Sequence, residues 1–180
     1  MAFVGIGSNR GSRVRNYCQA LALLDQQRGT RLVAVSNLFL AQPVGVSRQR
    51  WFINGVAGVE TTLSAQKFFS LLQEIEEKLG RTRPYPGAPR TIDLDLLFFN
   101  GLIWLGERLR IPHPEIWRRR FVLAPLAEIA ADFHDPVTKL TVKELLASCP
   151  DKSRLRLALP SARLRAVLSG EESSLRQEVY

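Results

Sequence analysis

The sequence predicts an α+β fold in which helices cover an antiparallel-rich sheet. Its 180 residues fit one domain, and short apolar runs of strand type alternate with amphipathic runs of helical spacing. The order of these runs, roughly β-α-β-β-α-β-β-α-α, mixes hairpin connections with helical crossovers, which favours this fold over a parallel doubly wound sheet. We take residues 1–160 as a single domain and residues 161–180 as a polar C-terminal tail that is free to fray.

The elements of the first half follow from hydrophobic spacing and from residues that start or stop them. Between Ser12 and Gly29, apolar side chains recur at helical spacing. The same holds between Ser64 and Gly80, where Phe68, Leu72, Ile75 and Leu79 form one apolar stripe. We therefore expect strands over 2–7, 31–39 and 52–61, helices over 13–27 and 65–79, and a long exposed loop over 41–51.

The second half is divided by turn-forming residues. Residues 81–90 hold three Pro, one Gly and three Arg, which is too many breakers for a regular element. A strand over 91–99 and a hairpin through Asn100 and Gly101 to residues 102–105 are expected to follow. Beyond them we expect helices over 116–130 and 142–147 and an edge strand over 154–159.

Charge and composition narrow the class of protein. The chain has 25 Lys and Arg against 17 Asp and Glu, a net charge of +8 dominated by Arg, which indicates an anionic partner. The longest uncharged stretch, 32–47, contains polar residues, so we expect no membrane-spanning helix. The N-terminus does not resemble a secretory signal, and we expect a cytoplasmic protein. Cys18 and Cys149 are far apart in sequence and form no C-x-x-C pair. We therefore expect neither a disulfide framework nor a zinc site.

Two carboxylates in the strand over 91–99 give the strongest local signal. Asp93 and Asp95 are two residues apart, so they point to one side while Ile92, Leu94, Leu96 and Phe98 point to the other. Their backbones lie roughly 7 Å apart, and the pair needs a counter-charge from a divalent metal or from Arg. Magnesium suits the first choice, because one or two carboxylates and substrate phosphates commonly hold it. The alternative is a pair of strand-edge Asp residues bridged to nearby Arg.

The residues just before this strand favour the metal. Arg81, Arg83 and Arg90 lie in the Pro-rich loop, and Arg90 is three residues from Asp93. A metal–phosphate site needs this mixture of carboxylates for the metal and guanidinium groups for the phosphoryl oxygens. A solvated basic loop is the alternative for the Arg residues taken alone.

Several other sequence patterns are weaker evidence for a functional site when each is taken alone. The glycine-rich run 5–11 fails both the Rossmann and the Walker A templates. His113 and His134 have no metal-ligand spacing, although the prolines around His113 would suit a positioned hydrogen-bond donor. Phe52 and Asn54 share a strand face that could seat a planar heterocycle, yet the pair is also routine at a core edge. Phe121 reads most simply as a core residue of its helix.

Taken together, several ordered motifs resemble the 6-hydroxymethyl-7,8-dihydropterin pyrophosphokinase family of folate biosynthesis, over about residues 2–150. The specific run is Pro89-Arg90-Thr91-Ile92-Asp93-Leu94-Asp95, followed by Ile111-Pro112-His113-Pro114. The further motifs are Gly7-Ser8-Asn9, Gln42-Pro43-Val44-Gly45, Phe52-Ile53-Asn54, Gly80-Arg81-Thr82-Arg83 and Arg119-Arg120-Phe121-Val122-Leu123-Ala124-Pro125-Leu126. The resemblance implies a catalytic domain built as a three-layer α/β/α sandwich around a ferredoxin-like sheet.

The resemblance also implies an activity and a set of site residues. Such enzymes transfer pyrophosphate from ATP to the hydroxymethyl group of the reduced pterin, release AMP and use two Mg²⁺ ions. Asp93 and Asp95 would hold both ions, and Arg81 and Arg90 would clamp the transferring phosphates. The implied ATP contacts are Gln73, Glu76, Arg83, Ile92, Arg108, His113 and Arg119, and the implied pterin contacts are Val44, Gly45, Phe52, Asn54 and Phe121.

Two other classes remain open on the sequence. The first is a basic, non-enzymatic nucleic-acid-binding α+β module, which the charge suggests but which leaves the Asp pair unexplained. The second is another metal-dependent phosphotransferase or a nuclease. Residues 81–120 hold eight Arg, no Lys and four acids, half of the excess charge, which favours a local triphosphate site. We therefore expect ATP and the pterin as partners, no nucleic acid or membrane, and a monomer.

Overall fold

The fold is taken from a computed structural model that describes residues 1–42, 50–82, 85 and 88–169. The strands are β1 (Ala2–Ser8), β2 (Thr30–Val35), β3 (Leu38–Ala41), β4 (Phe52–Thr61), β5 (Asp93–Phe99), β6 (Trp104–Leu105), β7 (Arg110–Ile111) and β8 (Arg156–Leu159). The helices are α1 (Arg13–Asp25), α2 (Ala65–Lys78), the 3₁₀ helix η1 (Ile116–Arg118), α3 (Arg120–Ala130), α4 (Val142–Ser148) and α5 (Ser161–Leu168).

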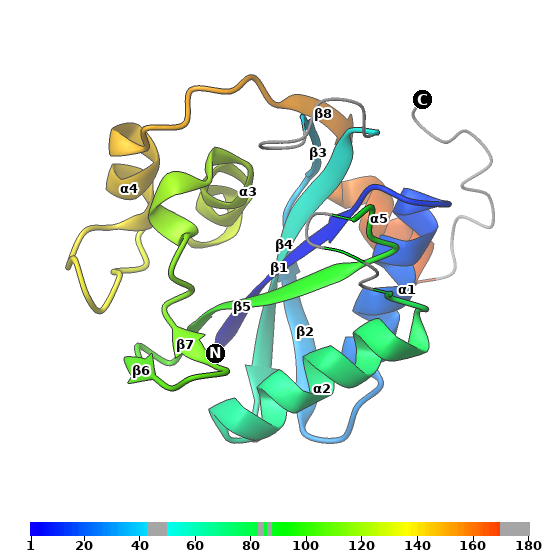
Figure 1. Ribbon diagram of the computed structural model, residues 1–180, viewed down its shortest axis with the longest axis horizontal. Helices are drawn as coiled ribbons and strands as arrows, with labels where there is room; N and C mark the ends of the chain where they lie inside the picture. The colour runs from blue at the N-terminus through cyan, green and yellow to red at the C-terminus, as the bar shows by residue number, and fades with distance from the viewer. Residues whose placement is uncertain (43–49, 83–84, 86–87, 170–180) are drawn as a thin grey trace.

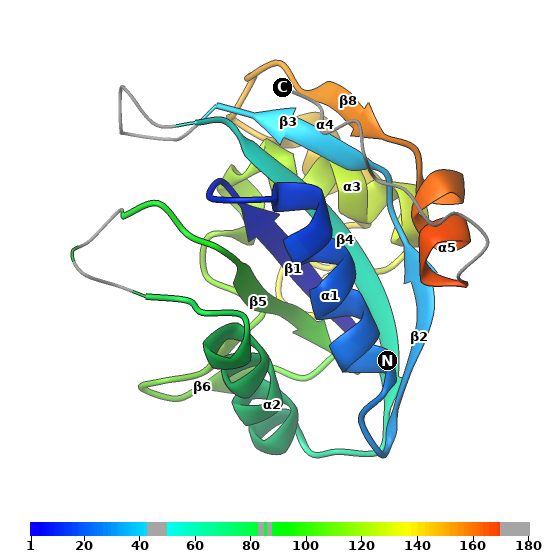
Figure 2. The same cartoon turned by 90° about the vertical axis from the view of Figure 1, so that its right-hand side faces the viewer.

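One antiparallel sheet organises the molecule. Its strand order is β5-β1-β4-β3-β8, with β2 also paired to β4. Helices α1, α2 and α5 cover one face, and α3 and α4 cover the other (Figures 1 and 2). The predicted α+β class, with an antiparallel sheet between two helical layers, is confirmed.

The predicted strand over 31–39 is in fact two strands. Strands β2 and β3 pair with the two ends of the long strand β4 and are separated by Ser36 and Asn37. Ser36 replaces a regular ladder contact, because its Oγ accepts a hydrogen bond from Val56 N at 2.9 Å. Asn37 contacts α3 instead, where its backbone and side-chain N–H groups donate to Glu128. The apolar pattern of the segment hides this break.

A bulge in β5 changes which side chains share a face. Val4 pairs with Leu96 and Phe3 pairs with Phe98, so Leu97 has no partner in the register. Leu94 and Leu96 pack under α1 and α2 as expected, but Leu97 and Phe98 both pack against α3 and α4. The prediction that Phe98 faces the same way as Leu94 is therefore wrong, because simple alternation ends at the bulge.

Two further expectations differ from the structure. Asn100 and Gly101 form the expected turn, with positive φ at both, but β6 pairs with β7 in a separate small sheet and not with β5. The first residues of the segment expected to be a frayed tail form α5, whose Leu164 is fully buried against the main core. The packed structure thus extends through residue 168, and residues 170–180 lie outside the described part of the chain.

The remaining elements follow the predicted pattern closely. The expected helix over 116–130 is interrupted at Arg119 and becomes η1 followed by α3. The final strand β8 lies at an edge of the sheet, next to β3. Within the described residues, none of the helices has the length and apolar character needed to cross a membrane.

Candidate active site

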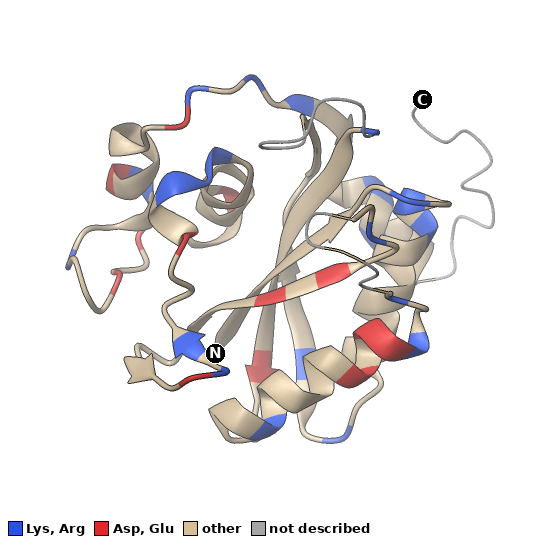
Figure 3. Cartoon of the chain, in the orientation of Figure 1, with Lys and Arg blue, Asp and Glu red and all other residues tan. Residues whose placement is uncertain are grey.

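A pocket of about 680 Å³ opens between the β5–β1–β4 part of the sheet and the start of α3. Polar or charged lining residues include Gln42, Asn54, Arg90, Asp93 and Asp95 on the sheet side and Glu115, Arg118, Arg119 and Asp151 on the α3 side. Aromatic and aliphatic lining residues include Phe52, Phe121 and Val122. The two predicted carboxylates therefore share one pocket with the predicted aromatic platform. Figure 3 shows the acidic positions of β5 between arginines of the α3 side and of the loop after α2.

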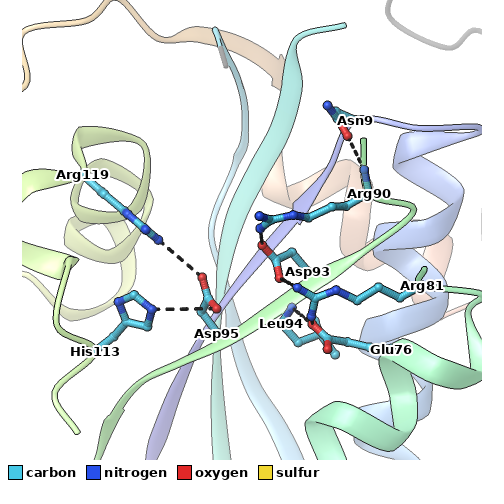
Figure 4. A network of polar contacts seen from close by, with 9 residues as sticks. All are labelled: Asn9, Glu76, Arg81, Arg90, Asp93, Leu94, Asp95, His113 and Arg119. Atoms are coloured by element: carbon cyan, nitrogen blue, oxygen red, sulfur yellow. Dashed lines mark hydrogen bonds and ion pairs between the residues drawn. The ribbon is translucent and has the colours of Figure 1, made fainter. Parts of the chain in front are cut away.

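Asp93 is held in a dense ion-pair cluster (Figure 4). Its two oxygens contact different guanidinium groups, Arg81 Nη2 at 2.5 Å and Arg90 Nη1. Arg81 also pairs with Glu76, and both of these side chains are less than a tenth exposed. Glu76 in turn accepts a hydrogen bond from Leu94 N at 2.6 Å, on the outer edge of β5. The cluster thus fixes the start of β5 to the end of α2.

Arg90 is also fixed through its backbone. Its N–H donates to Asn9 Oδ1 at 2.7 Å, and its carbonyl accepts from Asn9 N at 3.1 Å. This two-bond contact ties the end of the Pro-rich loop to the turn after β1. The Gly-Ser-Asn motif near the N-terminus therefore has a structural use here, and Arg90 reaches the pocket from a fixed backbone.

Asp95, on the same strand, has longer and weaker contacts with basic side chains than Asp93 has. Its nearest basic groups are Arg119 Nη1 at 3.7 Å and His113 Nε2 at 3.9 Å, and its side chain is 34% exposed. Burial, together with the charge of Asp93, raises the pKa of Asp95 above the ordinary value despite these neighbours. Asp95 is thus the carboxylate of the pair whose charge is least compensated by protein groups.

His113 is placed beside Asp95 by backbone contacts. Its N–H donates to the carbonyl of the bulged Leu97 at 3.0 Å, and its Nδ1 accepts from Glu115 N at 3.2 Å. The second bond leaves Nε2 to carry the ring proton and to face Asp95. Burial lowers the pKa of His113 below its usual value although Asp95 opposes this shift.

The end of the pocket that β4 and α3 line suits a planar ring. Asn54 is 7% exposed, and its Nδ2 has no hydrogen-bond partner among the described residues. Phe52 and Phe121 line the pocket from different sides of the site, β4 and α3. Gly7 gives these groups room, because a Cβ there would meet Asn54 Oδ1 at 3.0 Å. A buried, unsatisfied amide in a pocket that two aromatic rings also line suits a planar ligand with polar edges.

The donor set suits magnesium. Two carboxylates from one strand face a single pocket beside guanidinium groups, and their oxygens are the hard ligands that Mg²⁺ prefers. Among the described residues no group of three or more His, Cys, Asp or Glu could hold a metal by itself. Phosphate oxygens of a ligand would therefore have to complete the coordination, as they do in many Mg²⁺–nucleotide sites.

Several residues predicted for the site do not line this pocket. Arg81 and Glu76 lie behind Asp93, Ile92 is fully buried in the core, and His113 stands behind Asp95. Gln73 on α2 and Arg108 between β6 and β7 are exposed side chains that are absent from its lining. The predicted Val44, Gly45 and Arg83 lie outside the described residues.

Other pocket residues were not predicted from the sequence. Arg118 and Glu115 neighbour predicted residues, and the run of three Arg beginning at Arg118 was a usable charge signal. Asp151 reaches the pocket from the connection after α4, and nothing in its local sequence indicates a site.

Comparisons with known proteins identify the family of the chain. Residues 3–131 match the family described as 7,8-dihydro-6-hydroxymethylpterin-pyrophosphokinase. The chain is 41% identical over 138 residues to the 2-amino-4-hydroxy-6-hydroxymethyldihydropteridine pyrophosphokinase of Bacillus subtilis, covering 77% of this chain and 83% of that protein. It is 39% identical over 155 residues to the protein of the same name from Pseudomonas aeruginosa, covering 86% and 95%.

A solved structure of a Plasmodium falciparum HPPK-DHPS variant gives a TM-score of 0.65 at 16% identity. The alignment covers 81% of this chain and 42% of that one, so the chain spans less than half of the longer protein. At this identity the likeness concerns the fold, and it agrees with the sandwich described above.

Proposed function

Because the chain belongs to the 7,8-dihydro-6-hydroxymethylpterin-pyrophosphokinase family, it is a pyrophosphokinase of folate biosynthesis, and we propose how its pocket carries out the transfer. ATP donates its terminal pyrophosphoryl group to the hydroxymethyl oxygen of 6-hydroxymethyl-7,8-dihydropterin, and AMP leaves. The observation that carries this proposal is the meeting of Asp93 and Asp95 with Phe52, Asn54 and Phe121 in one pocket.

The acidic and basic end of the pocket would receive the phosphates. Asp93 and Asp95 would hold two Mg²⁺ ions, which, when bound, neutralise phosphoryl charge and orient the transferring group. Arg90 and Arg119 line the pocket on opposite sides of the two carboxylates, and so are placed to bind phosphoryl oxygens that the metals leave free. Arg81, which the family resemblance implies as a phosphate clamp, lies behind Asp93 and would contribute by holding that carboxylate in place.

The aromatic end would receive the pterin. Phe52 and Phe121 supply the stacking surfaces, and the free Nδ2 of Asn54 supplies a donor for a polar edge of the ring. The ligand would satisfy an amide that otherwise stays buried without a partner, which favours a heterocycle with an acceptor at that position. Phosphoryl transfer then needs mainly positioning and charge neutralisation, and both are present at one site.

The residues implied by the family resemblance outside this pocket keep their proposed roles. Val44 and Gly45 would line the pterin site, and Arg83 would contact ATP. Gln73, Glu76, Ile92, Arg108 and His113 would contact ATP or support groups that do. We place the reaction in the cytoplasm, carried out by a monomer with no nucleic acid or membrane as partner.

The test is a product analysis. Purified protein with ATP, Mg²⁺ and 6-hydroxymethyl-7,8-dihydropterin should form AMP and pterin diphosphate in equal amounts, with no ADP. Reactions that lack the pterin or contain EDTA serve as controls and should form neither. Accumulation of ADP would contradict the proposal. Absence of turnover together with tight, salt-sensitive RNA or DNA binding would favour the nucleic-acid-binding alternative.

A further inference from the structure

The segment Trp117–Phe121, where η1 ends and α3 begins, carries side chains that line both ends of the pocket. Arg118, Arg119 and Phe121 all line it. Arg119 reaches toward Asp95 at 3.7 Å, and its guanidinium carbon lies 6.0 Å from the centre of the Phe121 ring. A small rotation of this segment would therefore displace the phosphate end and the ring end together.

Neither η1 nor α3 has an N-cap side chain that makes a capping hydrogen bond. Arg119 occupies the N-cap position of α3, and its side chain makes no capping hydrogen bond. The 3₁₀ helix η1 likewise has no side-chain cap at Glu115. The fixed position of the segment has to come from contacts with other parts of the chain.

Asp135 provides the first of these contacts. It is fully buried, and its Oδ2 accepts a hydrogen bond from the indole Nε1 of Trp117 at 2.7 Å. The same carboxylate accepts from Thr138 Oγ1 at 2.7 Å and from the backbone N–H groups of Val137 and Thr138. All four partners are donors, so an ionised carboxylate fits the position and an amide would not.

Asp151 provides the second contact. Its Oδ2 accepts from Arg120 N, the first N–H of α3, at 3.1 Å. Its Oδ1 accepts from Ser153 N at 2.8 Å, which fixes the side chain in a local turn. Burial works against ionisation, but the hydrogen bonds from Ser153 and Arg120 hold the pKa of Asp151 below its ordinary value. A carboxylate from a distant connection thus replaces the missing cap of α3.

We propose that Asp135 and Asp151 are positioning residues that hold the Trp117–Phe121 segment from its two ends and thereby align Arg119 and Phe121 for the reaction. Both acids lie beyond residues 3–131, the part that matches the family. The part of the chain after residue 131 therefore contributes to the active site without supplying the reacting groups. Displacing a positioned group by about 1 Å can cost about a hundredfold in rate, so the two contacts have kinetic consequences.

The experiment uses two variants that each remove one bond and little else. Trp117→Phe deletes the indole N–H and keeps a ring in the core, while Asp135 keeps its donors from Val137 and Thr138. Asp151→Asn keeps an oxygen for Ser153 but turns the other atom, which faces Arg120 N, into a donor. The matched controls are Trp104→Phe on the exposed strand β6 and Glu144→Gln in the capping box of α4; neither residue lines the pocket.

The readouts are kcat and KM for AMP formation, and calorimetric affinities for magnesium–ATP and for the pterin, at a temperature where all variants are folded. The inference rests on the proposed function for the kinetic readout only. We expect Trp117→Phe and Asp151→Asn each to lower kcat/KM about tenfold or more and to weaken both ligands, with the controls within twofold of the original protein.

Two results would overturn the inference. One is kinetic and binding values within twofold of the original protein for both variants, which would make the contacts purely structural. The other is a loss restricted to one ligand in each variant, which would make them local contacts and not a shared alignment. If the original protein forms no AMP, the proposed function fails, and the magnesium–ATP affinities still decide whether the two contacts align Arg119.

Discussion

Asp93 and Asp95 lie on one strand and face one pocket, yet their surroundings differ sharply. Asp93 is 15% exposed and touches two guanidinium groups, one of which is itself tied to the buried Glu76. Asp95 is 34% exposed, and its nearest basic groups, Arg119 and His113, are 3.7 and 3.9 Å away. Asp93 therefore also stabilises the fold, whereas the charge of Asp95 is mainly available to a ligand.

The difference shows how one strand can serve stability and chemistry at once. A buried ion pair adds little net stability when complete, but removing one partner leaves a buried charge unpaired and is costly. A long contact between side chains that are about one third exposed has little effect on folding either way. We therefore expect Asp93 and Asp95 to be equally needed for activity and very unequal in their effect on stability.

The largest expected effect is on turnover. Asp95→Asn keeps the size of the side chain but removes the charge of a proposed metal ligand, whose contribution of several kcal/mol would correspond to about a thousandfold in rate. AMP formation should fall by at least that factor, while the circular dichroism spectrum and the urea midpoint stay close to those of the original protein. Activity within tenfold of the original would show that the metal is held by other groups.

The second prediction concerns stability. Asp93→Asn leaves Arg81, 7% exposed, with Glu76 as its remaining carboxylate and frees Arg90. We expect a loss of about 3 kcal/mol in the free energy of unfolding, at the lower end of the range for broken buried pairs because Glu76 still compensates Arg81. Urea denaturation without added metal measures it, and Asp95→Asn is the matched control, expected within about 1 kcal/mol. Equal losses in the two variants would remove the distinction drawn between these carboxylates.

The smallest expected effect is that of the exposed carboxylate of Glu144, which serves as a reference for Asp93 and Asp95. Hydrogen bonds from Thr141 lower the pKa of Glu144 below its ordinary 4.5. A lowered pKa in the folded state means that its contribution is present above pH 4.5 and is lost as pH falls through the folded value. The thermal midpoint of Glu144→Gln should therefore be slightly lower than that of the original protein at pH 7, and the difference should shrink as the pH falls below 4.5. A difference that does not shrink there would mean that the cap does not depend on the charge.

The parts of this account that rest on local pattern could be predicted from the sequence. Period-two alternation was enough to place Asp93 and Asp95 on one face, and the apolar stripe of α2 with its flanking Ser64 and Gly80 gave that helix to within one residue. These features depend on neighbours in sequence, where side-chain direction follows backbone geometry.

The features that depend on contacts between residues far apart in the sequence could not be predicted from it. The bulge at Leu97 arises from the register between β5 and β1, and the break at Ser36 from pairing with β4. The ties from Asp135 and Asp151 to the η1–α3 segment join residues 18 and 31 apart in sequence. No local pattern marks such contacts, because they exist only once the chain is folded.

The most direct test of the central claim, that Asp93 and Asp95 together hold magnesium for the nucleotide, is a binding measurement. Calorimetric titration with a non-hydrolysable ATP analogue, with and without Mg²⁺, gives the gain in affinity that the metal provides. We predict a gain of at least tenfold for the original protein and its loss in both Asp95→Asn and Asp93→Asn. A full magnesium-dependent gain in Asp95→Asn would contradict the account.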